Sequence, residues 1–501
     1  MAQIAFSPSP GIFRIGTEKE SSGKWYAGNL IRWTNGQLRP IYGWQAHSPS
    51  AYTGACRSLL AWKDNAASSW IGIGTHSKLY IMSKAGTLYD VTPAAYTVGR
   101  ADSTAAAGYG NGVYGGNSNY GAPIPDTTSI LDATTWSLDT WGQNLVGVTP
   151  DDTNIYQWVA PTTGTIAAKV TNSPTCAALV VTPERFLFAL GSTDPRTVSW
   201  CDQGNNTVWT PTVTNQAGSF PLLTFGRIMC GRPLAGGTAI WTDADMWIAN
   251  YIGGTLIYGF QRVGNGCGVV SRQAVAVANS QAVWMGAASF WLWNGYPQPL
   301  PCDVQDYVFG NINRAQISKV YAVRNSQFNE VWWFYPSAGS IENDSVVVWD
   351  YAENTWATHN IARTAACDVT GAFQVPLMAN PTDNLVYEHE TGFGYSGAAP
   401  YAETGPLQFA PLAASYQALT PGVFVATKFV PDDTLIGDVT ATFKAKFYPD
   451  GPETVIGPLT LTPKVDVRFS ARQVKMRIAG VRADDWRFGI GTLEVNGRQE
   501  R

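Results

Sequence analysis

Few side chains of this 501-residue sequence occur in types and spacings that could perform chemistry. The chain has four histidines, and no two stand at the spacing of metal ligands: His47, His76, His359 and His389. His389 lies between Glu388 and Glu390, but in a strand these carboxylates point away from the imidazole, so the three do not predict one site. A polar surface segment is the simpler interpretation.

Aspartates in pairs or boxes are the other candidates. Asp243 and Asp245 would share one face of a strand and could hold a cation, although a role in a turn is the simpler interpretation. The segment Ser199–Trp209 comes near the Asp box of sialidase-like propellers, with one extra residue between Ser199 and Asp202. Glycoside hydrolysis needs two opposed carboxylates, or a Tyr–Glu pair with an arginine cluster, and the sequence offers no identifiable pair. We therefore predict that the chain is not an enzyme and has no catalytic residues, no cofactor and no metal site.

The elements that carry these residues are predicted to be short β-strands. The chain contains 20 Trp, 22 Tyr, 20 Phe, 50 Gly and 30 Pro, and only 14% of its residues are charged. Aromatic and turn-forming residues in such numbers favour an all-β fold, and the scarcity of charge indicates a surface covered by other subunits. A net charge of −4 excludes DNA binding driven by counterion release, whereas a neutral or acidic wall suits passive passage of DNA.

Internal repetition predicts a β-propeller over residues 51–399. Alternating apolar clusters recur about every 45 residues, which is the period of a four-stranded blade. Trp200–Trp209 and Trp349–Trp356 share one pattern: a strand ending in Trp, then an Asp, an Asn-Thr pair and a second Trp. Counting clusters predicts seven blades, with six or eight as alternatives, and a multi-sheet β-sandwich is the alternative architecture.

The two ends of the chain are predicted to fold separately from the propeller. Residues 1–50 are expected to form a lead-in of short strands with a hairpin at an Asn-Gly turn. Residues 400–501 predict a C-terminal antiparallel β-sandwich, because apolar and polar residues alternate along its strands. In one of these strands Phe443 and Phe447 are expected to be buried.

Residues 94–130 interrupt the propeller pattern with a tract of Gly, Asn, Ser and Tyr that cannot form a packed core. No Lys or Arg occurs between Asp102 and Asp151, so an extension here would not grip phosphate groups. We expect its tyrosines to lie at a channel or tip: Tyr109, Tyr114 and Tyr120. A flexible surface loop is the alternative.

Basic residues of the predicted sandwich form a candidate contact between subunits: Arg468, Arg472, Lys475 and Arg477. A solvated strand face is the alternative interpretation. The seven cysteines lack a Cys-x-x-Cys pair and are expected to be buried, reduced thiols in a protein folded in cytoplasm. No signal-peptide pattern and no long apolar run occur, so no membrane span is expected.

Three stretches carry a family resemblance: Gly28–Trp44, Ile73–Pro93 and Tyr448–Gln473. They resemble the opening segment, the strand-and-turn run that follows it and the C-terminal domain of the tail hub or nozzle proteins of short-tailed bacteriophages. These proteins are also called packaged-DNA stabilisation proteins. The family has no catalytic residues to transfer to this chain.

The resemblance implies a structural protein of the virion that assembles in the host cytoplasm. It implies a homo-hexameric ring, a nozzle or hub, that extends the portal and adaptor channel, retains packaged DNA and conducts it at ejection. The implied partners are the tail adaptor ring, tail fibres or needle and tip proteins, and DNA in the lumen without sequence-specific binding. The alternative is a carbohydrate-binding or sialidase-like β-propeller, acting as a receptor-binding tail module or a glycoside hydrolase.

Overall fold

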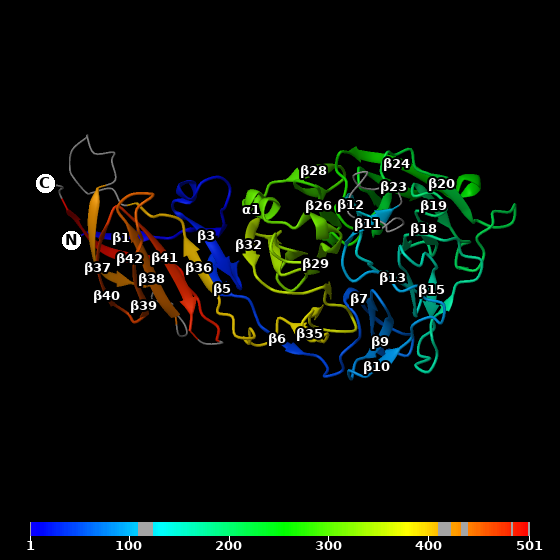
Figure 1. Cartoon of the computed structure of the whole chain (residues 1–501), viewed down its shortest axis with the longest axis horizontal. Coiled ribbons are helices and arrows are strands. Elements are labelled where there is room, and N and C mark those ends of the chain that lie inside the picture. The colour runs from blue at the N-terminus through cyan, green and yellow to red at the C-terminus, as the bar shows by residue number, and fades with distance from the viewer. Residues whose placement is uncertain (1, 109–123, 409–421, 432–438, 482–483, 499–501) are drawn as a thin grey trace.

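The computed structural model describes residues 2–108, 124–408, 422–431, 439–481 and 484–498, and β-strands dominate it. Seven four-stranded sheets form the blades of a propeller, and two further sheets form a sandwich at one end of the molecule (Figure 1). In these ranges the only α-helix is α1 (Gln305–Gly310), and no helix is long and apolar enough to cross a membrane. The predicted all-β class, with a propeller and a C-terminal sandwich, is confirmed.

Each blade is an antiparallel meander whose first strand lies nearest the propeller axis. The first three blades comprise β7 (Cys56–Lys63), β8 (Ser69–Thr75), β9 (Leu79–Ser83) and β10 (Leu88–Asp90); β13 (Ser137–Trp141), β14 (Asn144–Val148), β15 (Tyr156–Trp158) and β16 (Ala168–Lys169); and β17 (Ala178–Val181), β18 (Leu187–Leu190), β19 (Thr197–Trp200) and β20 (Gly218–Pro221). The next three comprise β21 (Ile228–Leu234), β22 (Gly237–Thr242), β23 (Asp245–Tyr251) and β24 (Tyr258–Asn265); β25 (Val275–Ala278), β26 (Gln281–Met285), β27 (Phe290–Trp293) and β28 (Pro297–Leu300); and β29 (Tyr321–Asn325), β30 (Glu330–Tyr335), β31 (Ser345–Asp350) and β32 (Thr355–His359).

The seventh blade closes the ring by combining both ends of the propeller sequence. It contains β33 (Ala365–Cys367), β34 (Leu377–Ala379), β35 (Val386–His389) and the N-terminal strand β6 (Trp44–Ala46). Trp44 pairs with His389, so backbone hydrogen bonds hold the first and last parts of the propeller together.

The middle strands of the blades are apolar on both faces because each blade packs between two others. All six residues of β30 are buried, including Trp332 and Trp333 on its opposite faces. All seven cysteines are also buried, as predicted.

The repeated Trp–Asp–Asn–Trp pattern is a turn between the two outer strands of a blade. Between β31 and β32, Oδ1 of Asp350 accepts the amide hydrogens of Ala352 and Glu353 at 2.8 and 3.0 Å. Asn354 has a φ of 52°, a left-handed conformation that Asn adopts more readily than most residues, and its Oδ1 accepts from Nε1 of Trp349 at 3.0 Å. The Asp and the Asn of this pattern therefore serve the turn.

The sandwich takes its strands from both ends of the chain. One sheet has the order β1 (Ala2–Phe6), β42 (Gly491–Arg498), β37 (Val423–Val430) and β40 (Val465–Ala471). The other has the order β2 (Ser9–Ile12), β3 (Lys24–Asn29), β36 (Tyr401–Thr404), β41 (Gln473–Gly480), β38 (Val439–Lys446) and β39 (Thr454–Thr460). The lead-in predicted for residues 1–50 is therefore divided between the sandwich, the seventh blade and one hairpin between them.

That hairpin consists of β4 (Ile31–Thr34) and β5 (Gln37–Pro40). Asn35 and Gly36 form its turn with φ values of 51° and 75°, which confirms the hairpin predicted from the Asn-Gly pair. Buried residues of the sandwich, of the hairpin and of the fourth to seventh blades belong to one continuous apolar cluster.

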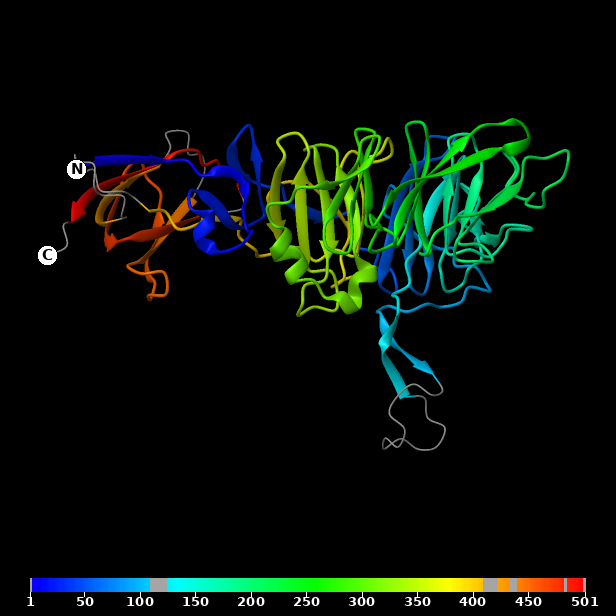
Figure 2. The same ribbon diagram turned by 90° about the horizontal axis from the view of Figure 1, so that it is seen from above.

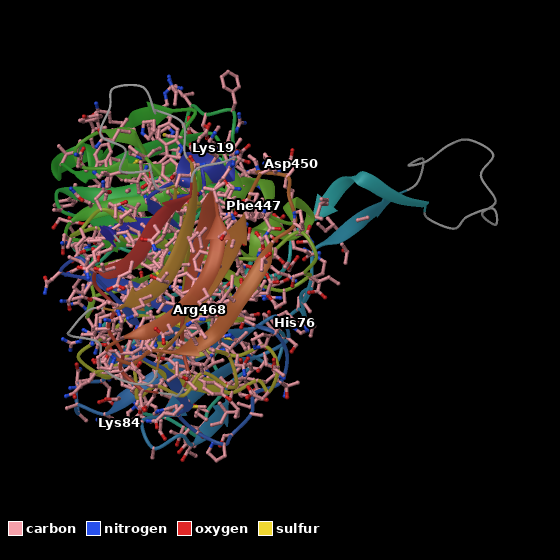
Figure 3. All side chains as sticks on the ribbon, turned by 90° about the vertical axis from the view of Figure 1, so that its left-hand side faces the viewer. Lys19, His76, Lys84, Phe447, Asp450 and Arg468 are labelled. Carbon is pink, nitrogen blue, oxygen red and sulfur yellow. The ribbon has the colours of Figure 1, made fainter. Side chains whose placement is uncertain are left out.

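The burial pattern of β38 follows the predicted alternation only as far as the strand extends. Phe443 is fully buried, as predicted, but Phe447 is 47% exposed. The prediction for Phe447 was wrong because β38 ends at Lys446, and the alternation of faces ends with the strand. Figure 3 shows Phe447 on the end of the molecule formed by the sandwich.

Candidate functional site

A two-stranded arm projects from one side of the propeller, away from all seven blades (Figure 2). It consists of β11 (Thr104–Gly108) and β12 (Ile124–Leu131), which pair in antiparallel register with an irregularity between Ala105 and Ala106. It is inserted between β10 of the first blade and β13 of the second. We call the residues at its two feet, Ala101–Ser103 and Asp132–Thr134, the arm anchor.

The first foot of the arm is bonded to the segment that joins the fifth and sixth blades. The side-chain amide of Gln316, in the 3-10 helix η3 (Arg314–Lys319), donates to the carbonyl of Ser103 and accepts from its amide, both at 2.9 Å. The hydroxyl groups of Ser103 and Ser318 lie 2.9 Å apart. Because both backbone groups of Ser103 are engaged by one buried side chain, this foot has a fixed position.

Two buried cations strengthen the same foot. Arg57 of β7 donates from both terminal nitrogens to Glu342 at 2.8 Å and also to the carbonyl of Ala101 at 2.7 Å. Nζ of Lys319 donates to Oδ1 of Asp102 at 2.5 Å, and the Lys319 side chain is fully buried. Burial lowers the pKa of Lys319, and the nearby carboxylate of Glu342 opposes that shift.

The second foot is bonded to the second and fourth blades. Nη2 of Arg227, just before β21, donates to Oδ2 of Asp132 at 2.8 Å. Arg100 donates from Nε to the carbonyl of Asp132 at 3.0 Å and from Nη2 to Asp151 at 2.5 Å. The hydroxyl of Thr134 donates to the same Asp151 carboxylate.

The arm anchor therefore reaches across the end of the propeller axis. In the sequence the arm is inserted between the first and second blades. Its feet are nevertheless bonded to the fourth blade and to the start of the sixth, on the other side of the ring. The basic side chains around the anchor all pair with carboxylates of the anchor or of its neighbours, so the base of the arm presents no surplus of positive charge to a nucleic acid.

The sequence-predicted insertion is longer than the arm. Residues 94–103 pack on the blades: the ring of Tyr96 stacks on Trp136 at 5.2 Å, and its hydroxyl donates to the carbonyl of His76 at 3.2 Å. The predicted tip residues lie outside the residues that the structure describes: Tyr109, Tyr114 and Tyr120.

The structure distributes the predicted basic contact residues over two sheets. Arg468 is exposed on β40 of the four-stranded sheet, and Figure 3 shows it on the sandwich end of the molecule. Lys475 and Arg477 lie on β41 of the six-stranded sheet, and Arg472 lies in the tight connection between the two strands. The chain changes sheet at this connection, so the four residues do not form one face.

Acidic neighbours already occupy part of this predicted contact. Lys475 pairs with Glu18 and, at 3.2 Å, with Glu453. The guanidinium of Arg477 lies 3.6 Å from the centre of the Tyr401 ring and 3.9 Å from Glu403. The proposed role of these basic residues between subunits stays a prediction.

The aspartates considered for chemistry serve turns. Asp245 accepts hydrogen bonds from the hydroxyls of Thr242 and Thr224 and from Nε1 of Trp247, at 2.5, 3.0 and 3.1 Å. Oδ1 of Asp202 accepts the amide hydrogen of Gln216 at 2.8 Å. Across the described ranges, no three His, Cys, Asp or Glu side chains come together as metal ligands.

Sequence reasoning missed a buried ionic network between the hairpin and the propeller. Arg32 of β4 donates to Glu330 of β30 and, from Nη1 and Nη2 at 2.9 and 2.6 Å, to Glu390. The side-chain amide of Asn325 donates to Glu390 at 2.8 Å, and Trp332 donates to Glu330 at 2.8 Å. The sequence feature that could have revealed this network is the presence of two charged residues, Arg32 and Glu330, in otherwise apolar strands.

His389 also differs from the sequence interpretation of a polar surface segment. Its ring is buried, and Nε2 accepts from Nε of Arg363 at 2.8 Å. Burial and the positive charge of Arg363 lower the pKa of His389, so this imidazole stays neutral.

No family model matches the sequence, and no curated protein matches it. Solved structures with a similar fold include a streptogramin B lyase, at 7% identity and a TM-score of 0.40, covering 70% of this chain and 97% of that chain. The WD40 domain of Neurospora crassa Pan2 matches at 9% identity and a TM-score of 0.39, covering 70% and 95%. Virginiamycin B lyase from Staphylococcus aureus matches at 7% identity and a TM-score of 0.41, covering 69% and 98%. This likeness concerns the fold alone.

Proposed function

We propose that this chain is a structural subunit of the tail of a short-tailed phage. Copies of it form a hexameric nozzle or hub in the virion, which continues the channel of the portal and adaptor rings. The ring retains packaged DNA and conducts it at ejection without reading its sequence. The proposal rests on the sequence resemblance described above and on the arm.

The anchored arm is the observation that carries the proposal. The arm projects away from the blades, so the propeller core does not need it, yet its feet engage buried Arg57 and Lys319. Burying cations costs free energy that only well-paired hydrogen bonds offset. An arm held this firmly and pointing away from its own domain suits a contact with something outside the chain, such as a neighbouring subunit or the lumen of a ring.

Exposed apolar loops support assembly into a ring. Phe225 and Val213 are fully exposed, and Leu223 is 81% exposed, all three on loops of the third and fourth blades. Leu223 and Phe225 line one groove, and exposed apolar side chains that lie together mark sites that a partner covers. The Arg32 network bonds the hairpin that follows the first sandwich strands to the propeller, and such a link suits a subunit held in a ring.

The test combines the mass of the assembly with removal of the arm. We expect native mass spectrometry of the purified chain, with the adaptor ring added, to show a six-fold species. A variant in which a Gly-Asn-Gly turn replaces residues 104–131 keeps both feet of the anchor. It should fold and form the ring, but filled particles carrying it should lose DNA or eject it poorly.

Two results would refute the proposal. One is a chain that stays a stable monomer at all concentrations and with the adaptor present. The other is a set of particles that retain and deliver DNA normally without the arm, which would leave the arm without the function assigned to it.

Carbohydrate binding by the propeller is the second candidate function. Exposed Phe225 borders a groove that is also lined by Asp194 and Arg196, and an aromatic ring beside polar groups suits a sugar. Glycan-array binding that Phe225→Ala abolishes would favour this function. Turnover of a glycan abolished by Asp202→Ala would favour a hydrolase and would overturn the prediction that the chain is not an enzyme.

A further inference from the structure

A cavity of about 270 Å³ lies on the axis of the propeller. The innermost segments of all seven blades contribute to its wall, from Ser58 in the first blade to Ala366 in the seventh. A cavity of this volume suits a small molecule or ion.

Two arginines of the cavity wall form no ion pair, although the charge of Arg232 acts on Asp139 across the cavity wall. Arg272 lies just before β25, and its Nη1 donates to the carbonyls of Ile228 and Met229 at 3.3 and 3.0 Å. Arg232 of β21 donates from Nη1 to the carbonyl of Gly231 at 2.9 Å. In the part of the chain that the structure describes, neither of these half-buried guanidiniums has a carboxylate oxygen within 4.0 Å, whereas the buried guanidiniums of Arg32 and Arg57 do.

The positive charge of Arg272 is not compensated by its surroundings. Burial lowers its pKa to about 10, and the charge of Arg227 acts in the same direction. Asp132 opposes this shift but is itself paired with Arg227 at 2.8 Å. Arg272 and Arg232 are half-buried, and a guanidinium inside the protein that forms no ion pair favours binding of an anion.

Asp139 is the one carboxylate of the wall, and its oxygens are already engaged. It accepts the amide hydrogens of Thr140 and Val181, each at 2.8 Å. Burial raises the pKa of Asp139, although the two amide hydrogen bonds and the charge of Arg232 oppose the shift. With Arg232 and Arg272 both charged, the wall keeps an excess of one positive charge even when Asp139 is ionised.

Hydrogen bonds between blades fix the geometry of the cavity. Nε2 of Gln273 donates to the carbonyl of Trp136 at 2.8 Å, which links the fifth blade to the second. The charges of Arg227 and of Asp132, a residue of the arm anchor, both act on Arg272, so this guanidinium lies on the side of the cavity toward the arm. Carbonyl groups hold Arg272 in place before any ligand arrives, which reduces the ordering cost of binding.

We propose that the axial cavity binds a small oxyanion, with Arg272 and Arg232 as its two ligating guanidiniums. The planar donor fork of arginine matches the oxygens of a phosphate or carboxylate, and the cavity accepts an ion of that size. The bound anion would join the fourth and fifth blades from the inside of the ring. This site is independent of the proposed role in a phage tail.

The test is isothermal titration calorimetry of the full chain with inorganic phosphate, and separately with citrate, at constant ionic strength set with chloride. We expect saturable binding of at least one of the two probes. The same probe should raise the melting temperature by about 2 °C at saturating concentration. Phosphate binding without citrate binding identifies a phosphate site, and the reverse identifies a carboxylate site.

Three variants assign the binding to the cavity. Arg272→Gln and Arg232→Gln should each weaken binding by about 10- to 100-fold, since each removes a charged hydrogen bond. Arg196→Gln, in a surface arginine paired with Asp194 at 3.1 Å, is the matched control and should change nothing. Asp139→Asn should tighten binding, because it removes the only negative charge of the wall.

The result for Asp139→Asn keeps the test decisive even if loss of Arg272 impairs folding. The proposal is overturned if neither probe binds saturably beyond the effect of chloride. It is also overturned if Arg196→Gln weakens binding as much as Arg232→Gln, or if Asp139→Asn leaves the affinity unchanged.

Discussion

Nε and Nη2 of Arg32 donate to Oε1 and Oε2 of Glu330 at 2.9 and 3.0 Å, and both side chains are only 4% exposed. This bidentate ion pair connects the hairpin of β4 and β5, which follows the first strands of the sandwich, to the sixth blade. The relative position of the two halves of the molecule therefore depends on one buried ionic contact as well as on apolar packing.

Breaking this pair should be strongly destabilising. Arg32→Met leaves Glu330 and Glu390 buried without a cation, and loss of one partner of a buried pair costs about 3–5 kcal/mol. We expect the urea midpoint of unfolding to fall accordingly. Lys78→Met is the control: its pair with Asp90 is about two-fifths exposed, and such surface pairs contribute about 0–1 kcal/mol. Equal shifts of the two midpoints would contradict the structural role given to Arg32.

The same site should make stability depend on pH near neutrality. Burial raises the pKa of Glu330 to about 7, although the charge of Arg32 opposes the shift. Between the ordinary value of 4.5 and about 7 the folded protein therefore binds more protons than the unfolded chain. The contribution of Glu330 to the free energy of unfolding is fully present below pH 4.5 and is lost as the pH rises through 7.

Glu330→Gln isolates this effect. The difference in unfolding free energy between wild type and Glu330→Gln should fall as the pH is raised from 5 to 7.5, at a slope of up to about 1.4 kcal/mol per pH unit. Urea titrations of both proteins at several pH values measure it. A difference that stays constant, or grows with pH, would show that Glu330 is already ionised at pH 5.

Truncation of Phe443 and of Phe447 should have very different effects on stability, although the two residues lie close together in the sequence. Phe443→Ala removes a fully buried ring from the sandwich core and should cost about 3–5 kcal/mol. Phe447→Ala removes the same atoms from a position that is 47% exposed and should cost about 1 kcal/mol or less. Thermal unfolding of both variants checks this. Similar losses would mean that β38 continues through Phe447.

The arm anchor should protect the backbone of its first foot from hydrogen exchange. Gln316→Ala removes both hydrogen bonds to Ser103, each contributing about 1 kcal/mol, so peptides covering residues 101–105 should exchange about 10- to 100-fold faster. Gln327→Ala, which removes an exposed bond to Gln374, should leave these peptides unchanged. Unchanged exchange in both variants would show that Gln316 does not hold the arm.

Local patterns predicted much of the fold. The Asn35-Gly36 turn and the Trp349–Trp356 turn depend on residues a few positions apart, so their conformations follow from side chains that lie beside them in the sequence. The blade count also follows from a regular repeat. In contrast, the pairing of Trp44 with His389 depends on backbone groups far apart in the chain, and a three-residue strand carries too few residues for a pattern.

The candidate site was predictable only in outline. The absence of Lys and Arg from the inserted segment, and its unusual composition, marked the arm as separate from the blades. Its anchor was not visible, because Gln316 and Lys319 are ordinary polar residues whose partners come from a distant part of the chain. The arginines of the axial cavity were hidden for the same reason, since only ring closure brings Arg232 and Arg272 to one wall.

The mixed origin of the seventh blade and of the sandwich has a consequence for synthesis. β6 has to wait for β35, β3 for β36, and β1 for β42, the last strand of the chain. At about 5–20 residues per second, a ribosome needs roughly 25–100 s to complete a chain of this length. Throughout that time the earliest strands present open edges, which can pair with other nascent chains on the same messenger RNA. The oldest part of each polypeptide is thus the last to be enclosed.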